Sequence, residues 1–217
     1  MDIIIIAVSL VITLIAQAAI SGNYKKYSSI NLKKEQSGAE IAREILDKNG
    51  LNNIYVVETR GVLSDHYDPR RKVIRLSNNI YSGKTIAAAA VAAHEVGHAL
   101  QDKAGYGFFK IRAAIVPIVN LASYLGYITL ALFAASQIRS LFVVSAVLLG
   151  STLVFHLVTL PVEFDATRRA KSELAKGFLN SSEQEGARKM LGSAAFTYVA
   201  GMITNILQFL RVFARRR

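Results

Sequence analysis

The segment AAHEVGHALQ, residues 92–101, holds three side chains whose types and spacing could perform hydrolytic chemistry. His94 and His98 are four residues apart, which on a helix is about 40° of rotation and about 6 Å of rise, so both imidazoles can reach one ion. Glu95 is turned by about 100° from His94 and lies beside that ion. In an H-E-x-x-H arrangement the histidines bind Zn²⁺ and the glutamate is the general base. We therefore predict His94 and His98 as zinc ligands and Glu95 as the catalytic base.

The residues before the motif predict the helix that carries it. Residues 86–93 are nearly all alanine, the best helix former, and Thr85 can accept a hydrogen bond as the N-cap. Gly97 lies inside the motif, although glycine in a helix costs about 1 kcal/mol relative to alanine. We interpret Gly97 as a place where another backbone approaches this helix closely.

A catalytic zinc ion needs three protein ligands and one open position. The chain has no cysteine, so the third ligand is a histidine or a carboxylate. The best candidate lies in TLPVEFDATRRA, where a hydrophobic segment ends at Pro161, a residue suited to the first position of a new helix. Glu163 follows at once, and we predict it as the third ligand. Asp165 is the alternative, either as the ligand itself or as a group that orients a ligand histidine.

Three uncharged segments are long enough to cross a bilayer, which takes about 20 apolar residues in a helix. Residues 3–20 follow an acidic rather than a basic residue and lack a convincing cleavage site, so they predict an uncleaved anchor. Residues 113–136 and 141–162 are separated only by QIRS and predict a transmembrane hairpin. A buried hairpin of a soluble protein is the less favoured alternative. Residues 193–210 are short for a span.

The basic residues orient these segments. The chain has a formal net charge of +11, and its 26 lysines and arginines gather in residues 21–112, 163–192 and 211–217, while the hairpin tip has only Arg139. Because positive residues stay on the cytoplasmic side, we predict that the N-terminus and the hairpin tip lie outside. A span at 193–210 would place four arginines outside, so we expect this segment to pack on the cytoplasmic domain or to lie in the membrane interface. This topology explains the basic excess, and we expect no nucleic-acid partner.

The segment between the first two hydrophobic runs predicts a small α+β domain. Residues 37–49 place apolar residues at helical spacing, with Ser37 as a possible N-cap and Gly50 just beyond the end. IYVVET and KVIRLS are strand-like, and Asp68-Pro69 indicates a turn between them. VIRLS, just before the motif helix, could be an edge strand that pairs with an extended substrate or an ordinary sheet strand.

The predicted fold is a mostly α membrane protein, in which transmembrane helices accompany a small α+β zincin-like cytoplasmic metallopeptidase domain. Its expected parts are the anchor at 1–21, the cytoplasmic peptidase domain at 22–112, the transmembrane helical hairpin at 113–162, and the third-ligand helix with the C-terminal apolar helix at 163–217.

Three blocks of the sequence together resemble the YugP-type membrane zinc metallopeptidases. They are AAHEVGHALQ, LSDHYDPRRKVIRLS and LPVEFDATRRA, and the likeness extends over nearly the whole chain. It implies two histidine ligands, a glutamate base and a downstream glutamate ligand, which match His94, His98, Glu95 and Glu163. The chain is more distantly similar to the HtpX and CAAX-processing membrane proteases. Their downstream motif has an aspartate where this chain has Thr167, so that aspartate cannot be carried over.

We therefore expect a multi-pass plasma-membrane zinc endopeptidase with its site at the cytoplasmic face, acting on peptides or membrane proteins and in contact with lipid. Intramembrane proteolysis is one alternative, but the apolar run before His94 is too short for a span. A non-enzymatic zinc scaffold is another, but a structural zinc usually has four protein ligands and only three are visible. Three other residues have a possible functional role, and for each the alternative is an ordinary structural role. The possible functional roles are a metal ligand for His66, an intramembrane site for His156 and an oxyanion donor for Tyr198. The sequence does not indicate an oligomeric state.

Overall fold

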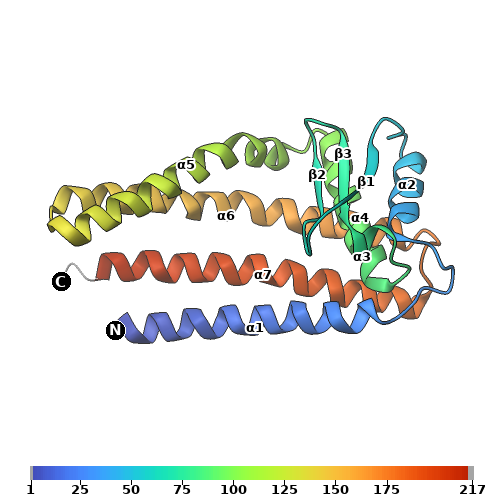
Figure 1. Ribbon diagram of the computed structural model, residues 1–217, viewed down its shortest axis with the longest axis horizontal. Helices are drawn as coiled ribbons and strands as arrows, with labels where there is room; N and C mark the ends of the chain where they lie inside the picture. The colour runs from blue at the N-terminus through green and yellow to red at the C-terminus, as the bar shows by residue number, and fades with distance from the viewer. Residues whose placement is uncertain (1, 215–217) are drawn as a thin grey trace. The chain divides into compact units, whose positions relative to one another are not determined.

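The computed structural model describes residues 2–214 and is mostly helical (Figure 1). In chain order the elements are α1 (Asp2–Ser28), α2 (Gly38–Lys48), β1 (Tyr55–Thr59), β2 (His66–Asp68), β3 (Val73–Ser77), α3 (Asn78–Tyr81), α4 (Ile86–Lys103), α5 (Gly107–Ser136), α6 (Arg139–Leu174) and α7 (Ser181–Ala214). They form two compact units. The helical unit comprises residues up to Ala16, Gly107–Pro161 and residues from Thr197 onward, and the α+β unit comprises Gln17–Tyr106 and Val162–Phe196.

The sheet of the α+β unit has the strand order β1-β3-β2, with β1 parallel and β2 antiparallel to β3. The predicted strands are confirmed as β1 and β3, which pair from Tyr55 opposite Val73 to Thr59 opposite Ser77. The three-residue strand β2 is not predicted by the sequence pattern, because it is too short to show a period. Since β3 lies in the middle of the sheet, VIRLS is an ordinary sheet strand, the second of the two alternatives, and β2 occupies the side that an extended substrate would have needed.

Helix α2 forms where the apolar spacing predicts it. Ser37 Oγ accepts a hydrogen bond from the Glu40 backbone N–H at 3.2 Å, and Glu40 Oε2 accepts one from the Ser37 N–H at 2.7 Å, which is a capping box. Gly50 just beyond the helix has a φ of 66°, a left-handed conformation that favours glycine. The helix packs against α4 through a face that comprises Ile41, Ala42, Ile45 and Leu46. This packing fixes one side of the motif helix.

Four helices in the described part of the chain are long and apolar enough to cross a membrane, namely α1, α5, α6 and α7. Only two residues join α5 to α6, so the predicted helical hairpin is present. Its helices approach closely at Gly126, where an added Cβ would lie 2.9 Å from Leu149 Cγ. Large apolar side chains nevertheless face outward, with Leu121 60% and Val147 71% exposed. The hairpin of a soluble protein would bury such side chains, so their exposure supports the membrane alternative.

The expectation that a new helix begins at Pro161 is wrong. Helix α6 runs without interruption from Arg139 to Leu174 and contains Pro161, just as α5 contains Pro117. Proline inside a helix removes one backbone hydrogen bond and costs about 3 kcal/mol. Membrane-spanning helices tolerate proline because neighbouring helices, Ser/Thr side chains and local adjustments of the backbone satisfy the freed backbone groups.

The C-terminal apolar segment also differs from our expectation. Residues 193–210 are part of α7, which has 34 residues, and its portion Ser181–Arg211 is long and apolar enough to cross a membrane. The uncharged run alone is short for a span, but the helix continues on both sides of it. Helix α7 is therefore a fourth candidate span, and the expectation of a helix that only packs on the domain or lies in the interface is not supported.

Candidate metal centre

Helix α4 presents the histidine motif from the interior of the α+β unit. Thr85 caps its first turn, as predicted, by accepting a hydrogen bond from the Ala88 N–H at 3.2 Å. Alanines dominate the turns before the motif, and those at positions 87–90 have no exposed surface. Side chains this small let the neighbouring elements approach the helix closely. The motif thus starts from a rigid, well-packed helix rather than from a mobile loop.

Gly97 is the point at which α6 touches α4. A Cβ atom added to Gly97 would lie only 2.5 Å from the carbonyl oxygen of Ala166, so the two backbones are in direct contact. The sequence-based interpretation of Gly97 as a site of close backbone approach is therefore confirmed. Ala166 lies three residues, about one turn, after Glu163 on α6. This contact brings Glu163 beside the two histidines.

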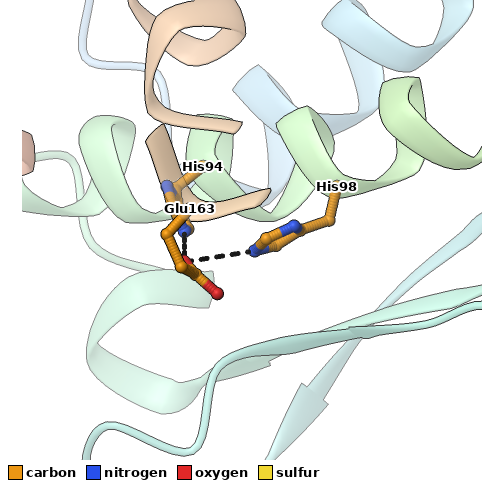
Figure 2. Close-up of side chains that lie close together, drawn as sticks. All are labelled: His94, His98 and Glu163. Carbon is orange, nitrogen blue, oxygen red and sulfur yellow. Dashed lines mark hydrogen bonds and ion pairs between the residues drawn. The ribbon is translucent and has the colours of Figure 1, made fainter. Parts of the chain in front are cut away.

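Three ligand-type side chains converge at this crossing (Figure 2). The Nε2 atoms of His94 and His98 lie 3.1 and 3.7 Å from Oε2 of Glu163, and the ligand atoms of all three lie within 4.8 Å of one another. Their side chains are only 15%, 8% and 2% exposed. Two imidazole nitrogens and one carboxylate oxygen are a donor set that catalytic zinc ions use. The chemistry and convergence of these groups fit such an ion, and among the described residues they are the group that could hold one.

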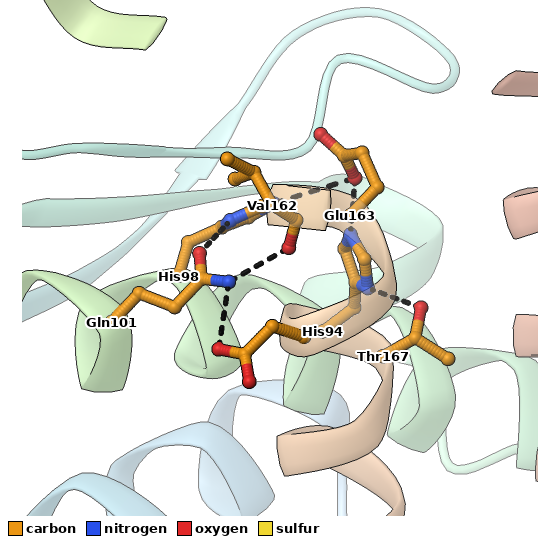
Figure 3. A network of polar contacts seen from close by, with 7 residues as sticks. His94, His98, Gln101, Val162, Glu163 and Thr167 are labelled. Carbon is orange, nitrogen blue, oxygen red and sulfur yellow. Dashed lines mark hydrogen bonds and ion pairs between the residues drawn. The ribbon is translucent and has the colours of Figure 1, made fainter. Parts of the chain in front are cut away.

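The Nδ1 atoms of both histidines face hydrogen-bonding partners (Figure 3). His98 Nδ1 lies 3.0 Å from Gln101 Oε1, and His94 Nδ1 lies 3.5 Å from the hydroxyl of Thr167. A ligand histidine commonly holds its second ring nitrogen in this way, which orients the ring and leaves the other nitrogen for the metal. The arrangement therefore points Nε2 of each ring toward Glu163.

Glu95 is buried beside this cluster, with 8% of its surface exposed. Burial raises its pKa to about 7, and the negative charges of Glu163 and Asp65 add to the rise, while His94 and His66 oppose it. A cation held by the cluster would attract the carboxylate charge and lower this pKa. With such a cation bound, the Glu95 carboxyl would be ionised near neutral pH, which is the form that can accept a proton as a general base. Its catalytic role stays a prediction.

The structure does not bring Asp165 into the cluster. Its carboxylate accepts hydrogen bonds from Gln101 at 3.1 Å and from Arg169 at 2.6 Å, and it pairs with Arg168. Asp165 thus touches His98 only through Gln101, which corresponds to the orienting alternative rather than to the ligand alternative. The assignment of Glu163 as the ligand remains a prediction that this geometry supports.

The other histidines and Tyr198 lie elsewhere. His66 is exposed on β2, where its Nδ1 lies 2.8 Å from the Ser64 carbonyl oxygen, and it is not part of the cluster. His156 belongs to the helical unit, with Nδ1 2.8 Å from the Thr152 carbonyl oxygen and Nε2 3.4 Å from Asn205 Nδ2. The contact with Thr152 is within α6 and the contact with Asn205 is between α6 and α7, and both fit the structural interpretation of His156. Tyr198 also lies in the helical unit, on α7, and its suggested oxyanion role stays a prediction.

Gln101 and Thr167 are two site residues that the sequence analysis did not assign. Gln101 stands three residues after His98 on the same helix, so a search for polar residues one turn from each ligand would have found it. Thr167 stands four residues after Glu163, at the position where the more distant protease families have an aspartate. Its hydroxyl lies 3.5 Å from Nδ1 of His94.

Comparison with known proteins agrees with this geometry. Residues 2–217 match the family described as "Putative neutral zinc metallopeptidase". The chain is 43% identical over 199 residues to "Putative membrane protease YugP" of Bacillus subtilis (strain 168), a match that covers 90% of this chain and 88% of that protein. No solved structure shows a significant match. The chain therefore belongs to the family with that description, and its relative is a membrane protein by name.

Proposed function

We propose that this protein is a membrane-anchored, zinc-dependent endopeptidase. The observation that carries the proposal is the convergence of His94 Nε2, His98 Nε2 and Glu163 Oε2, with the buried carboxyl of Glu95 on the same helix turn. His94, His98 and Glu163 would hold the ion and leave a position open. A bound zinc ion polarises a carbonyl group and lowers the pKa of water to about 7.

Side chains of the protein would then carry out the proton transfers. Glu95 takes a proton from the attacking water and later passes it to the leaving nitrogen of the cleaved peptide bond. Its burial keeps bulk water away from this proton. Gln101 and Thr167 keep the two imidazole rings oriented while the peptide binds and leaves.

We further propose that the α+β unit is a zincin-like peptidase domain on the cytoplasmic side of the plasma membrane. The small sheet beside the motif helix supports the zincin-like fold, and the basic residues support the location. If all four candidate helices cross the membrane, residues 21–112 and 163–192 lie on one side with 21 of the 26 basic residues. The other side then has only five, including those after residue 210. The positive-inside rule therefore favours a cytoplasmic site even with α7 as a span. Peptides or membrane proteins are the substrate class that fits this location.

The two alternatives are less favoured. Intramembrane cleavage would need the motif helix in the bilayer, but α4 is not among the candidate spans of the described chain. A scaffold with structural zinc would need a fourth protein ligand, whereas the described cluster has three members.

The proposal is tested with the full-length protein in lipid nanodiscs, using zinc content and cleavage of a casein substrate as the two readouts. Glu95→Gln keeps the side chain's size and removes its capacity to take a proton, so we expect hydrolysis to be lost and zinc to stay bound. Glu185→Gln is the matched control, because Glu185 forms only surface ion pairs on α7. Wild-type cleavage by the Glu95→Gln protein, or cleavage that survives complete removal of zinc, would contradict the proposal.

A further inference from the structure

We propose that Gln101 is a positioning residue for ligands on both helices of the metal centre. Its amide oxygen fixes the tautomer of His98 on α4, and its amide nitrogen fixes the backbone that carries Glu163 on α6. This inference rests on the proposed function. Gln101 has no exposed surface, although glutamine is mostly found on protein surfaces. A buried amide is costly unless its hydrogen bonds are made.

The contacts of Gln101 define the direction of each hydrogen bond (Figure 3). Its Nε2 donates to the Val162 carbonyl oxygen at 2.7 Å and to the Asp165 carboxylate at 3.1 Å. A backbone carbonyl can only accept, so the NH₂ group of the amide must face Val162 and the oxygen must face His98. His98 Nδ1, 3.0 Å from that oxygen, must then donate. A neutral imidazole with its proton on Nδ1 has its lone pair on Nε2, the atom that faces Glu163.

The same side chain also fixes the other ligand. Val162 immediately precedes Glu163 on α6, and its carbonyl accepts the short bond from Gln101. Gln101 therefore joins α4 to α6 next to one ligand on each helix. Because one amide makes both contacts, a shift of α6 along α4 would break the bond that orients His98. The Gln101 side chain is fully buried, so a peptide that binds from the surface would not contact it.

If Gln101 only joined the two helices and had no positioning role, its replacement would have a different result. Its loss would lower the stability of the fold without changing zinc affinity in the protein that remains folded. A positioning role predicts that zinc affinity and kcat fall while KM stays nearly unchanged, since Gln101 does not contact the substrate.

The test compares Gln101→Met and Gln101→Glu with the wild-type full-length protein in nanodiscs. Zinc affinity is measured by competition with a chromophoric chelator, and kcat and KM are measured on a peptide substrate. Methionine matches the length of glutamine but loses both hydrogen-bonding groups, and we expect zinc affinity to fall about 10- to 100-fold. Glutamate keeps the acceptor for His98 and loses the donor to Val162, so we expect an affinity between those of wild type and Gln101→Met. Gln184→Glu is the control, because Gln184 lies on α7 and its side-chain amide donates to the Leu179 carbonyl oxygen, away from the metal centre.

The outcomes separate this inference from the proposed function. A wild-type protein that binds no zinc and cleaves nothing would overturn the proposed function and this inference with it. A wild-type protein that binds zinc and cleaves peptide, with Gln101→Met equal to it in zinc affinity, would overturn this inference alone. Zinc affinity of Gln101→Met equal to or above that of Gln101→Glu would overturn the tautomer argument. If Gln101→Met does not fold, Gln101→Asn replaces it, since its shorter side chain cannot reach both partners, and wild-type zinc affinity in that variant would equally overturn the inference.

Discussion

The contact between Gly97 and Ala166 allows a sharp test of how the metal centre is assembled. In Gly97→Ala the new Cβ would lie 2.5 Å from the Ala166 carbonyl oxygen, about 1 Å short of the roughly 3.5 Å of an ordinary contact. Helices α4 and α6 must separate by a distance of that order. Because Glu163 lies one turn before Ala166, it would move away from His94 and His98 by a similar amount.

The expected effect on function is larger than the effect on stability. A displacement of about 1 Å in a catalytic constellation can cost about 100-fold in rate, and we expect a loss of that order in kcat/KM with weaker zinc binding. Overpacking costs about 1–3 kcal/mol, but alanine is favoured over glycine in a helix by about 1 kcal/mol. The free energy of unfolding should therefore fall by only about 0–2 kcal/mol.

The assay measures zinc affinity, kcat/KM and thermal unfolding for Gly97→Ala and for a matched control. Gly192→Ala is that control, because Gly192 lies inside helix α7 and an added Cβ there meets no atom within 4 Å. We expect the control to keep its activity and to gain up to about 1 kcal/mol of stability. If Gly97→Ala also kept its zinc affinity and its activity, the crossing at Gly97 could not be what positions Glu163.

The ligand assignment, the topology and the cap of α4 can each be tested separately. Glu163→Ala should lose zinc outright, whereas Asp165→Ala should weaken zinc binding by about 10- to 100-fold through Gln101. The measurement is zinc bound per chain, and a greater loss of zinc in Asp165→Ala than in Glu163→Ala would exchange the two roles. Because the chain has no cysteine, an impermeant maleimide on intact cells should label Ser136→Cys at the hairpin tip and spare Ser82→Cys in the α+β unit; labelling of Ser82→Cys alone would place the site outside. Thr85→Ala removes the cap of α4 and should lower the free energy of unfolding by about 1 kcal/mol in chemical denaturation, and an unchanged value would show that the cap contributes nothing.

Local sequence signals predicted several elements correctly because their stabilising contacts lie within a few residues. The N-cap of α4 at Thr85 and the N-cap of α2 at Ser37 each join residues three apart. The hydrophobic periodicity of α2 and the apolar residues of β1 and β3 are likewise local. The long uncharged runs indicated helices for a membrane without any knowledge of the fold.

Local signals failed where a distant partner decides the structure. Strand β2 has only three residues, and it forms because Tyr67 pairs opposite Ile74 on β3 and is buried there. No pattern within HYD shows that pairing, so the place of β3 in the sheet was also left open. Pro161 is a local helix breaker, yet α6 continues through it. The parts of α6 before and after Pro161 are long and keep their own backbone hydrogen bonds.

The sequence by itself determined which residues could bind a metal, because an H-E-x-x-H pattern places His94 and His98 on one helix face whatever surrounds the helix. It could not decide between Glu163 and Asp165. Two residues apart on a helix, they are separated by about 200° of rotation and so lie on nearly opposite faces. Which of them reaches the histidines depends on the face of α6 that meets α4. That face is fixed by the backbone contact at Gly97 and by the amide of Gln101, which bonds the carbonyl oxygen next to Glu163. Both contacts join residues more than 60 positions apart, and such contacts exist only once the tertiary structure has formed.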